Sequence, residues 1–394
     1  MSGGGHGVSA TGKERIRELA VAVLEEYGLP EASPSFLRAG RGKHIFRVAS
    51  PGERDFLLRM YAPPVSAKRR RSFSEPALRS QLLWQESLRN EAGLPVPEPV
   101  RTPAGSLTVS ASTPGVPEAR SCVLVSWVPG QTRAAEEMSA EDMRLAGSMV
   151  ARMHDHAARY AAPEGFSRTR HDWNQLFRPS AGIWKRGEQF YTAAEMKLFR
   201  AVAQRTRREM LRLGEGNEAF GLIHRDIHPE NIVFGRDGVA VIDFEGCGWG
   251  HYLYDLAVTL FRLEDHGNRG AILGEAFLEG YQRVRPIPES HRAYLETFVT
   301  LRVVNKINGI LLREDPASHP HSADFLSGSP ALERLAEYAE GGRASELGGR
   351  WWPRAAVSSL ASRALGRCKR FSCTASPGLW QTEEMLKTCV FGVL

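Results

Sequence analysis

The stretch that decides the fold runs from Gly221 to Ala257 and reads GLIHRDIHPENIVFGRDGVAVIDFEGCGWGHYLYDLA. Two apolar runs in it flank the turn sequence Gly-Arg-Asp-Gly, and this pattern predicts a β-hairpin. Asp226 and Asn231 precede the hairpin and Asp243 follows it, so we expect their side chains to meet at one end of a rigid scaffold. Oxygen ligands suit a hard cation such as Mg²⁺, which completes its shell with phosphate and water.

The spacing of these residues matches the kinase catalytic template. In that template an Asp accepts the substrate hydroxyl proton, an Asn five residues later holds a metal ion, and the Asp of an Asp-Phe-Gly sequence holds another. His224-Arg225-Asp226 and Asp243-Phe244-Glu245 occupy the corresponding places here. A single Asp at such a place is usually an ordinary loop carboxylate, but all the elements in this order favour the kinase interpretation.

The stretch resembles the aminoglycoside phosphotransferase and choline kinase family, the small-molecule branch of the kinase-like fold. That family has H-x-D-x-H-x-x-N, then I-D-[FW]-[DE], then a helix that starts Y-D-[LI]-A, and all three patterns occur here. The resemblance spans Pro34 to Arg313 and implies an α+β, two-lobed protein-kinase-like fold. We expect a flexible N-terminus over 1–12, a small nucleotide-binding lobe over 13–127, a large catalytic lobe over 128–340 and a poorly ordered tail over 341–394.

The resemblance also implies roles for the residues around the hairpin. Asp226 would accept the proton of the acceptor hydroxyl, or orient the attacking oxygen, and Asn231 and Asp243 would hold Mg²⁺. His228 would brace the loop, and Glu245 would touch the substrate or the second shell of the metal. The first-turn residue Asp255 is expected to act as a helix cap.

In the small lobe, the segment that contains Gly40, Arg41, Gly42 and Lys43 links two expected strands. Backbone amides next to glycine can approach phosphate oxygens closely, although a Gly-x-Gly between strands is also typical of a plain hairpin. Arg59, in the strand FLLRMY, stands where kinases place a phosphate-binding lysine. Arginine keeps its charge and can bind two phosphate oxygens, so it suits the same role; an exposed edge-strand arginine is the alternative.

The resemblance places the adenine at the connection between the lobes, against the carbonyl of Ser126 and the amide of Val128. One position departs from the family pattern. The helix glutamate that pairs with the strand cation falls on Gln81, whose neutral amide could hydrogen-bond Arg59 but not offset its charge. Glu86, on the next helical turn, is the alternative partner.

Hydrophobic periodicity and turn residues predict the remaining elements. We expect helices over 13–27, 77–90, 139–158, 193–213, 251–263, 268–284 and 290–312, and strands over 35–38, 44–49, 55–61, 108–112 and 122–127. By the resemblance, the last three helices form the wall that binds the acceptor. Arg302 and Lys306 in that wall count against a polycationic aminoglycoside, and leave an amino-acid-like, sugar-like or choline-like alcohol open.

Composition sets limits on the other function classes. The 394 residues are 42% hydrophobic and 24% charged, and the net charge is +6. We interpret this charge as an arginine-rich surface and expect no nucleic-acid partner, because no basic motif interleaved with aromatic residues occurs. We expect no membrane span, a cytoplasmic location, a monomer or homodimer, and free thiols at the five cysteines.

The sequence therefore predicts an enzyme that uses ATP and Mg²⁺ to phosphorylate a hydroxyl group of a small molecule. An atypical Ser/Thr protein kinase is one alternative, although the segment after Asp243 leaves no room for an activation loop. A nucleotide-binding pseudokinase with a regulatory role is another, which Gln81 favours and the intact Asp226, Asn231 and Asp243 oppose.

Overall fold

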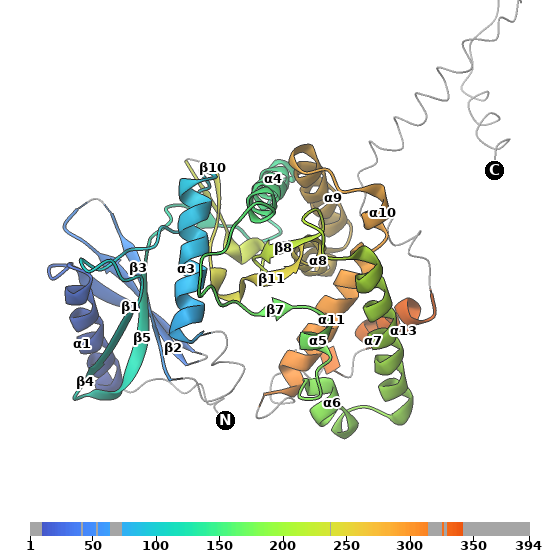
Figure 1. Ribbon diagram of the computed structural model, residues 1–394, viewed down its shortest axis with the longest axis horizontal. Coiled ribbons are helices and arrows are strands. Elements are labelled where there is room, and N and C mark those ends of the chain that lie inside the picture. The colour runs from blue at the N-terminus through green and yellow to red at the C-terminus, as the bar shows by residue number, and fades with distance from the viewer. Residues whose placement is uncertain are drawn as a thin grey trace, which may run out of the picture. The chain divides into compact units, whose positions relative to one another are not determined.

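The computed structural model describes residues 10–40, 42–52, 54–63, 73–236, 238–313, 325–326 and 329–341, which form a small and a large lobe (Figure 1). This arrangement confirms the expected α+β, two-lobed fold. Arg41 and the expected tail beyond Gly341 lie outside the described residues. The first helix begins at Ala10, three residues before the expected start at Lys13.

The small lobe is built on a five-stranded antiparallel sheet with the strand order β1-β2-β3-β5-β4. Its strands are β1 (Ser33–Gly40), β2 (Lys43–Ala49), β3 (Phe56–Tyr61), β4 (Val109–Thr113) and β5 (Val116–Ser126). Helix α1 (Ala10–Glu26) covers one face of this sheet and α3 (Glu75–Asn90) packs against the other. Strand β5 begins six residues before the expected start at Cys122, because it pairs with β4 along a longer hairpin.

Strand β3 shows how successive side chains of one strand are divided between the two faces of the sheet. Leu58 and Met60 are buried in the cluster that includes α1. Leu57 and Tyr61 belong to the cluster on the α3 side. Because successive side chains in a strand point to opposite faces, Arg59 lies on the same face as Leu57 and Tyr61. This face carries the polar residues described below.

The large lobe is mainly helical. Its helices are α4 (Ala140–Ala157), α5 (Trp173–Leu176), α6 (Gly182–Arg186), α7 (Ala193–Leu213), α8 (Tyr252–Leu263), α9 (Gly267–Val284), α10 (Glu289–Arg292), α11 (Leu295–Leu311) and α13 (Ser329–Ala339). Ser139 with Asp142 and Thr192 with Glu195 form capping boxes at α4 and α7, and the Asp172 side chain caps α5. The expected helix over 290–312 is divided into α10 and α11 near Tyr294.

Two small sheets complete this lobe. The predicted hairpin is present as β9 (Ile232–Gly235) and β10 (Gly238–Val241), and β6 (Gln131–Thr132) adds a third strand to it. The second sheet has the order β7-β11-β8, from Arg170–His171, Gly248–His251 and Phe220–Ile223. Short 3₁₀ turns precede β9 and follow β10, at Pro229–Asn231 (η2) and Phe244–Gly246 (η3).

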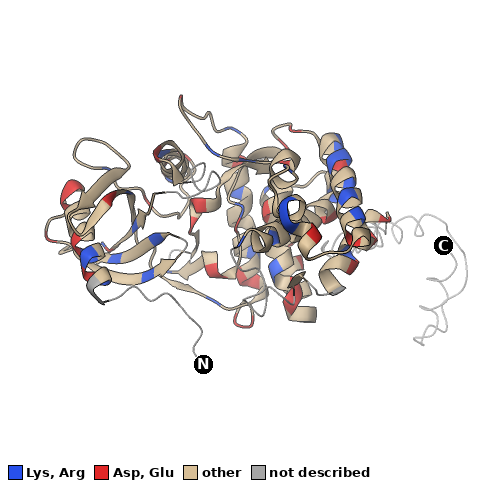
Figure 2. Cartoon of the chain, turned by 90° about the horizontal axis from the view of Figure 1, so that it is seen from below, with Lys and Arg blue, Asp and Glu red and all other residues tan. Residues whose placement is uncertain are grey.

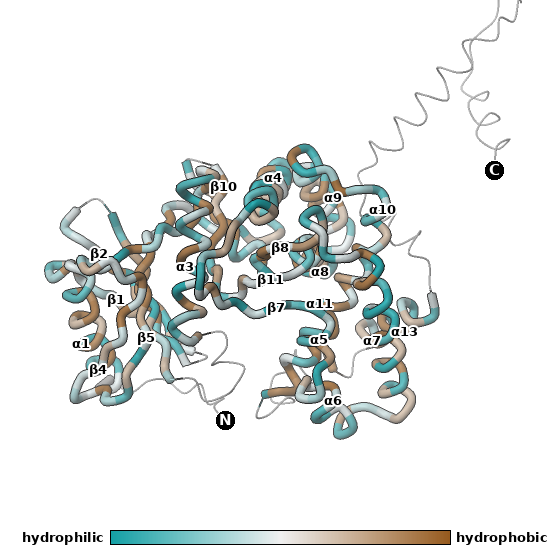
Figure 3. The backbone as a smooth tube through the Cα atoms, viewed as in Figure 1, coloured by the Kyte–Doolittle hydropathy of each residue, from teal (hydrophilic) through white to brown (hydrophobic). Residues whose placement is uncertain are grey.

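Helix α8 lies at the centre of the large-lobe core. Nearly all of its residues are buried, including Leu256, Val258 and Leu260. A helix that is apolar on most sides is stable only when other elements surround it, and α9, α11, β8 and β11 do so here. Figure 3 shows hydrophobic residues recurring along the elements of both lobes with hydrophilic ones between them.

Charged residues of both signs are interspersed over both lobes (Figure 2). Helix α7 carries more basic than acidic residues, with Lys197, Arg200, Arg205, Arg207, Arg208 and Arg212 against Glu195 and Glu209. No helix in the described ranges combines the length and the apolar character that crossing a membrane requires.

Helices α4 and α9 approach each other closely through glycines. Ser148 donates its hydroxyl to the Gly280 carbonyl at 3.0 Å. A methyl group at Gly147 would overlap the Phe277 carbonyl oxygen of α9, and one at Gly280 would overlap the Arg144 carbonyl of α4. The backbones can approach this far only because both positions lack a Cβ atom.

Gly147→Ala is therefore expected to lower the free energy of unfolding by about 1–3 kcal/mol, the usual cost of overpacking a close contact. Urea denaturation followed by circular dichroism measures the change. Gly309→Ala is the matched control, because nothing lies within 4 Å of a Cβ there and α11 should gain helix propensity. Equal stability changes in the two variants would contradict the close contact of α4 with α9.

Candidate active site

The β9–β10 hairpin brings the expected polar residues to one end of its scaffold. The antiparallel pairing continues beyond the strands, since the Ile242 amide donates to the Asn231 carbonyl at 3.0 Å. Asn231 donates its side-chain amide to the Asp226 carbonyl at 2.9 Å. Because Asp243 directly follows Ile242, it lies beside Asn231. Asp226, Asn231 and Asp243 thus meet as the sequence predicts.

Two residues of this site have a left-handed backbone although neither is glycine. The φ angle is 73° at Arg225 and 66° at Asp243. Such a conformation costs on the order of 1–3 kcal/mol per residue and persists only where the surroundings impose it. Strain of this kind gathers at functional sites, and here it lies directly before Asp226 and at Asp243 itself.

The buried carboxylate of Asp255 imposes the conformation of the first of these residues. It accepts hydrogen bonds from the backbone amides of His224, at 2.8 Å, and Arg225, at 2.5 Å. His154 of α4 lies 3.2 Å away through Nε2. The expectation that Asp255 caps a helix is wrong: α8 begins after His251, and the carboxylate holds the loop that carries Asp226.

His228 braces the same loop, as expected. Its Nδ1 lies 2.6 Å from the Glu230 carboxylate, and its Nε2 lies 3.1 Å from the Asn231 side-chain nitrogen and 3.5 Å from the Asp226 carboxylate. The ring therefore links three side chains of the loop. These contacts fix the orientation of Asp226 and Asn231.

The Asp226 carboxylate has a cation on its other side. Arg302 of α11 approaches it to 3.3 Å. Burial alone would raise the pKa of Asp226, but the hydrogen bond with His228 and the charge of Arg302 outweigh it and hold this pKa well below its usual value. Asp226 is therefore an ionised carboxylate, able to accept a hydrogen bond, across the neutral pH range.

The small lobe contributes cations to the same place. Arg59 is only 6% exposed, and its guanidinium lies 3.3 Å from Asp243 and 3.6 Å from Glu245. Lys43, the first residue of β2, places its Nζ 2.6 Å from both carboxylate oxygens of Glu245. Burial would raise the pKa of Asp243, but Arg59 and Lys43 outweigh it and lower this pKa. Acidic groups of the large lobe thus face basic groups of β2 and β3.

The expected helix partner of Arg59 is not found on α3. Gln81 is buried and donates its side-chain amide to Gln85 at 3.1 Å. Glu86 binds Arg101 through two hydrogen bonds, at 2.9 and 2.6 Å. The prediction that Gln81 or Glu86 is the partner of Arg59 is therefore wrong. The counter-charges of Arg59 are Asp243 and Glu245 instead.

The other expected nucleotide contacts lie on the small lobe or at its end. Gly40 pairs with Lys43 across a tight connection in which Gly42 has φ 67°, a conformation that suits glycine. Ser126 ends β5 and its amide donates to the Glu98 carbonyl at 2.8 Å. Val128 follows two residues later.

Asp243 also fits the oxygen ligand set of a hard cation. Its Oδ1 atom is buried and accepts no hydrogen bond from the described residues, and its nearest charged neighbour is Arg59. A buried carboxylate oxygen with spare lone pairs can take a metal ion as its partner.

Comparison with known proteins agrees with this geometry. The sequence pattern of the "Phosphotransferase enzyme family" matches residues 35–294, about two thirds of the chain. The chain belongs to that family.

Named relatives of this phosphotransferase are homoserine kinases. The enzyme of Azorhizobium caulinodans is 27% identical over 254 residues, which cover 59% of this chain and 72% of the relative. That of Rhizobium rhizogenes is 29% identical over 191 residues, which cover 45% of this chain and 53% of the relative.

Solved structures share the fold. A microcompartment-associated aminopropanol kinase superposes with a TM-score of 0.65 at 25% identity, covering 83% of this chain and 99% of its own. A choline kinase of Cryptosporidium parvum superposes with a TM-score of 0.57 at 12% identity, covering 82% and 97%. The expectation of an enzyme with the kinase-like phosphotransferase fold is therefore confirmed.

Sequence analysis did not assign three residues to this phosphotransferase site that the structure places there. Tyr61 donates its hydroxyl to Glu245 at 2.8 Å, and its place two residues after Arg59 on β3 could have indicated this. Arg168 donates to the backbone carbonyls of Glu245 and Cys247, at 2.7 and 2.6 Å. Asp255 holds the loop backbone. The contacts of Arg168 and Asp255 with the main chain leave no pattern in the sequence.

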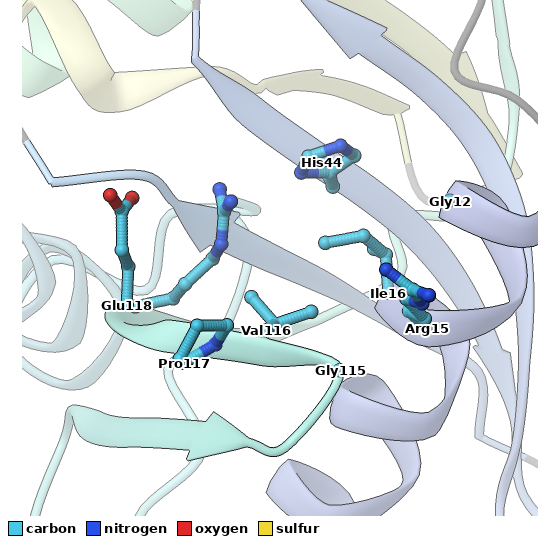
Figure 4. Close-up of a pocket in the computed structure, with 9 residues that line it drawn as sticks. Gly12, Arg15, Ile16, His44, Gly115, Val116, Pro117 and Glu118 are labelled. Carbon is cyan, nitrogen blue, oxygen red and sulfur yellow. The ribbon is translucent and has the colours of Figure 1, made fainter.

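A separate hollow of about 470 Å³ lies on the small lobe (Figure 4). It is lined by residues from the start of α1, from β2, from the β4–β5 turn and from the first half of β5, namely Gly12, Arg15, Ile16, His44, Gly115, Val116, Pro117, Glu118 and Arg120. His44 lies on the α1 side of the sheet, opposite to Arg59. The hollow thus includes none of the residues around the hairpin.

Asp255→Asn is expected to lower the free energy of unfolding by about 1.5–3 kcal/mol, because it weakens charge-assisted hydrogen bonds to two buried amides. Guanidinium denaturation followed by tryptophan fluorescence measures this change. The exposed Asp265 gives the control variant Asp265→Asn, which should leave stability within about 0.5 kcal/mol. A similarly small effect at Asp255 would refute its role in holding the loop.

Proposed function

We propose that this phosphotransferase moves the γ-phosphate of ATP, with Mg²⁺, to the hydroxyl group of a small amino-acid-like molecule. One observation carries the proposal: Asp226, Asn231 and Asp243 meet at the hairpin end, while Lys43 and Arg59 face them from the small lobe. Carboxylate and amide oxygens suit the metal, and paired cations suit the phosphates. Catalysis of phosphoryl transfer consists mostly of such positioning and charge stabilisation.

In this proposal Asp226 acts on the acceptor. Its ionised carboxylate accepts the hydrogen bond of the acceptor hydroxyl and takes the proton as the oxygen attacks phosphorus. His228 and Arg302 hold the carboxylate in position from two sides. A carboxylate with a lowered pKa is a weak base, so its orienting effect on the oxygen is as important as proton removal.

The remaining expected residues would bind the nucleotide. Asn231 and Asp243 would hold Mg²⁺, which when bound neutralises charge on the phosphate oxygens. Arg59 and Lys43, with the backbone of Gly40, Arg41 and Gly42, would contact the phosphates. The adenine would bind the carbonyl of Ser126 and the amide of Val128.

The acceptor class follows from the charges of α11. Arg302 lies 3.3 Å from Asp226, and its Nε is buried without a hydrogen-bond partner among the described residues. One helical turn later, Lys306 lies 3.8 Å from the ring centroid of Phe325. Arg302 beside Asp226, with Lys306 one helical turn away, favours an acceptor that carries a carboxylate and disfavours a polycation. The similarity to homoserine kinases supports the same class.

The first test is ADP release from Mg-ATP in the presence of L-homoserine. Asp226→Asn should retain Mg-ATP binding and lose about 10²-fold or more of kcat, because the amide cannot accept the proton.

Asp243→Ala should lose the Mg²⁺-dependent part of ATP binding, measured by calorimetry. Wild-type turnover in Asp226→Asn would refute the assignment of the base, and unchanged Mg-ATP affinity in Asp243→Ala would refute that of the ligand.

A second test uses two acceptors that differ only in a carboxylate, L-homoserine and 3-aminopropan-1-ol. The wild-type enzyme should prefer homoserine, and Arg302→Gln should reduce the ratio of the two kcat/KM values about tenfold or more through the lost charged contact. The ratio cancels any effect of the variant on Asp226 itself. Arg283→Gln, at an exposed residue of α9, is the control. An unchanged ratio in Arg302→Gln would contradict a carboxylate subsite.

A further inference from the structure

The side chain of Glu245 is surrounded by hydrogen-bond donors of the small lobe. Lys43 contacts both of its carboxylate oxygens at 2.6 Å, and the hydroxyl of Tyr61 donates to one of them at 2.8 Å. Arg59 lies 3.6 Å away. The carboxyl side chain is 12% exposed. Three groups from β2 and β3 therefore converge on one carboxylate of the large lobe.

The backbone under this carboxylate is also held in place. Glu245 lies in the short turn η3, directly after Phe244. Phe244 in turn follows Asp243, whose backbone is strained. Arg168 fastens the turn, since it donates to the Glu245 carbonyl and also to the Ala77 carbonyl of α3, at 2.7 and 3.0 Å. The carboxylate thus has a defined position from which to orient its partners.

Helix α3 offers no carboxylate for this purpose. Gln81 and Glu86, the two candidates on it, are engaged with Gln85 and Arg101. Among the described residues, Arg59 forms ion pairs with Asp243 and Glu245, and Lys43 forms one with Glu245. Since Asp243 would be occupied by a metal, Glu245 is left as the counter-charge of both cations.

We propose that Glu245 is a positioning residue that orients Lys43 and Arg59 and competes with the phosphate groups of the nucleotide for them. This inference rests on the proposed function only in assigning phosphate as the ligand of the two cations. Without nucleotide, Lys43 pairs with Glu245, and Arg59 pairs with Glu245 and Asp243. With nucleotide, the phosphates share the cations that Glu245 has aligned.

The two parts of this role have opposite effects on binding and on turnover. Removing the charge of Glu245 removes an anion that competes with phosphate, so nucleotide should bind more tightly. The same change leaves the cations less well aligned with the transferring group. A misplacement near 1 Å can cost about 10²-fold in rate, so kcat should fall between about tenfold and a hundredfold.

Glu245→Gln tests the proposal, because it keeps the size of the side chain and removes only its charge. The affinity for ATP is measured by calorimetry in EDTA, and again with Mg²⁺. We expect metal-free ATP to bind several-fold more tightly than to the wild type, and kcat with homoserine to fall. The control Glu279→Gln, which removes a salt-bridged glutamate on α9, should change neither.

Two results would overturn the proposal. Weaker ATP binding in Mg²⁺ with unchanged metal-free binding would make Glu245 a metal ligand instead. Unchanged metal-free affinity and unchanged kcat would leave it a merely structural residue. Calorimetry needs no acceptor, so a wild-type enzyme that phosphorylates no tested alcohol would contradict the proposed function while the binding result still decides the role of Glu245.

A second variant covers the case in which Glu245→Gln does not fold. Tyr61→Phe removes the hydroxyl that donates to Glu245 and leaves every charge in place. The carboxylate then lacks one of its donors and binds Lys43 and Arg59 more strongly, so metal-free ATP should bind more weakly than to the wild type. Metal-free binding equal to or tighter than the wild type would contradict competition between Glu245 and phosphate.

Discussion

The hydrogen bonds from two backbone amides to the buried carboxylate of Asp255 are the constraint on which the site depends. Asp255 lies on α8, which the rest of the large lobe surrounds. Through His224 and Arg225 it fixes the conformation of the chain directly before Asp226. The cost of the left-handed Arg225 is offset by these charge-assisted bonds. A helix of the buried core thereby sets the position of the half-buried Asp226 carboxylate.

The lobes meet at this site through charge. Asp243 and Glu245 of the large lobe face Lys43 and Arg59 of the small lobe, and each cation is largely buried. A buried charge is costly unless it is paired, so removal of either acid would affect both lobes. Under the proposed function, a nucleotide would bring further anionic groups to cations that already have partners, and its phosphates would compete with these acids. Binding and lobe contact are therefore coupled at these residues.

Sequence reasoning located the residues whose positions follow from local spacing. Asp226, Asn231 and Asp243 flank one hairpin, so their meeting follows from strand pairing alone. The contacts of Glu245 with Lys43 and Tyr61 join positions 202 and 184 residues apart, and no local pattern encodes them. The sequence shows that position 81 holds a neutral glutamine where an acid was expected. It does not show that Glu245, after the hairpin, takes the place of that acid. Asp255 was predicted to cap its own helix. Its partners are main-chain amides of His224 and Arg225, and such contacts leave no residue pattern in the sequence.

The central claim is that this site transfers phosphate to an alcohol. The most direct measurement is ³¹P NMR of the wild-type protein with Mg-ATP and L-homoserine. Our account predicts a new phosphomonoester resonance that grows in equal amount with ADP. ADP accompanied only by inorganic phosphate, or ATP that remains intact with every amino-acid-like alcohol offered, would contradict it.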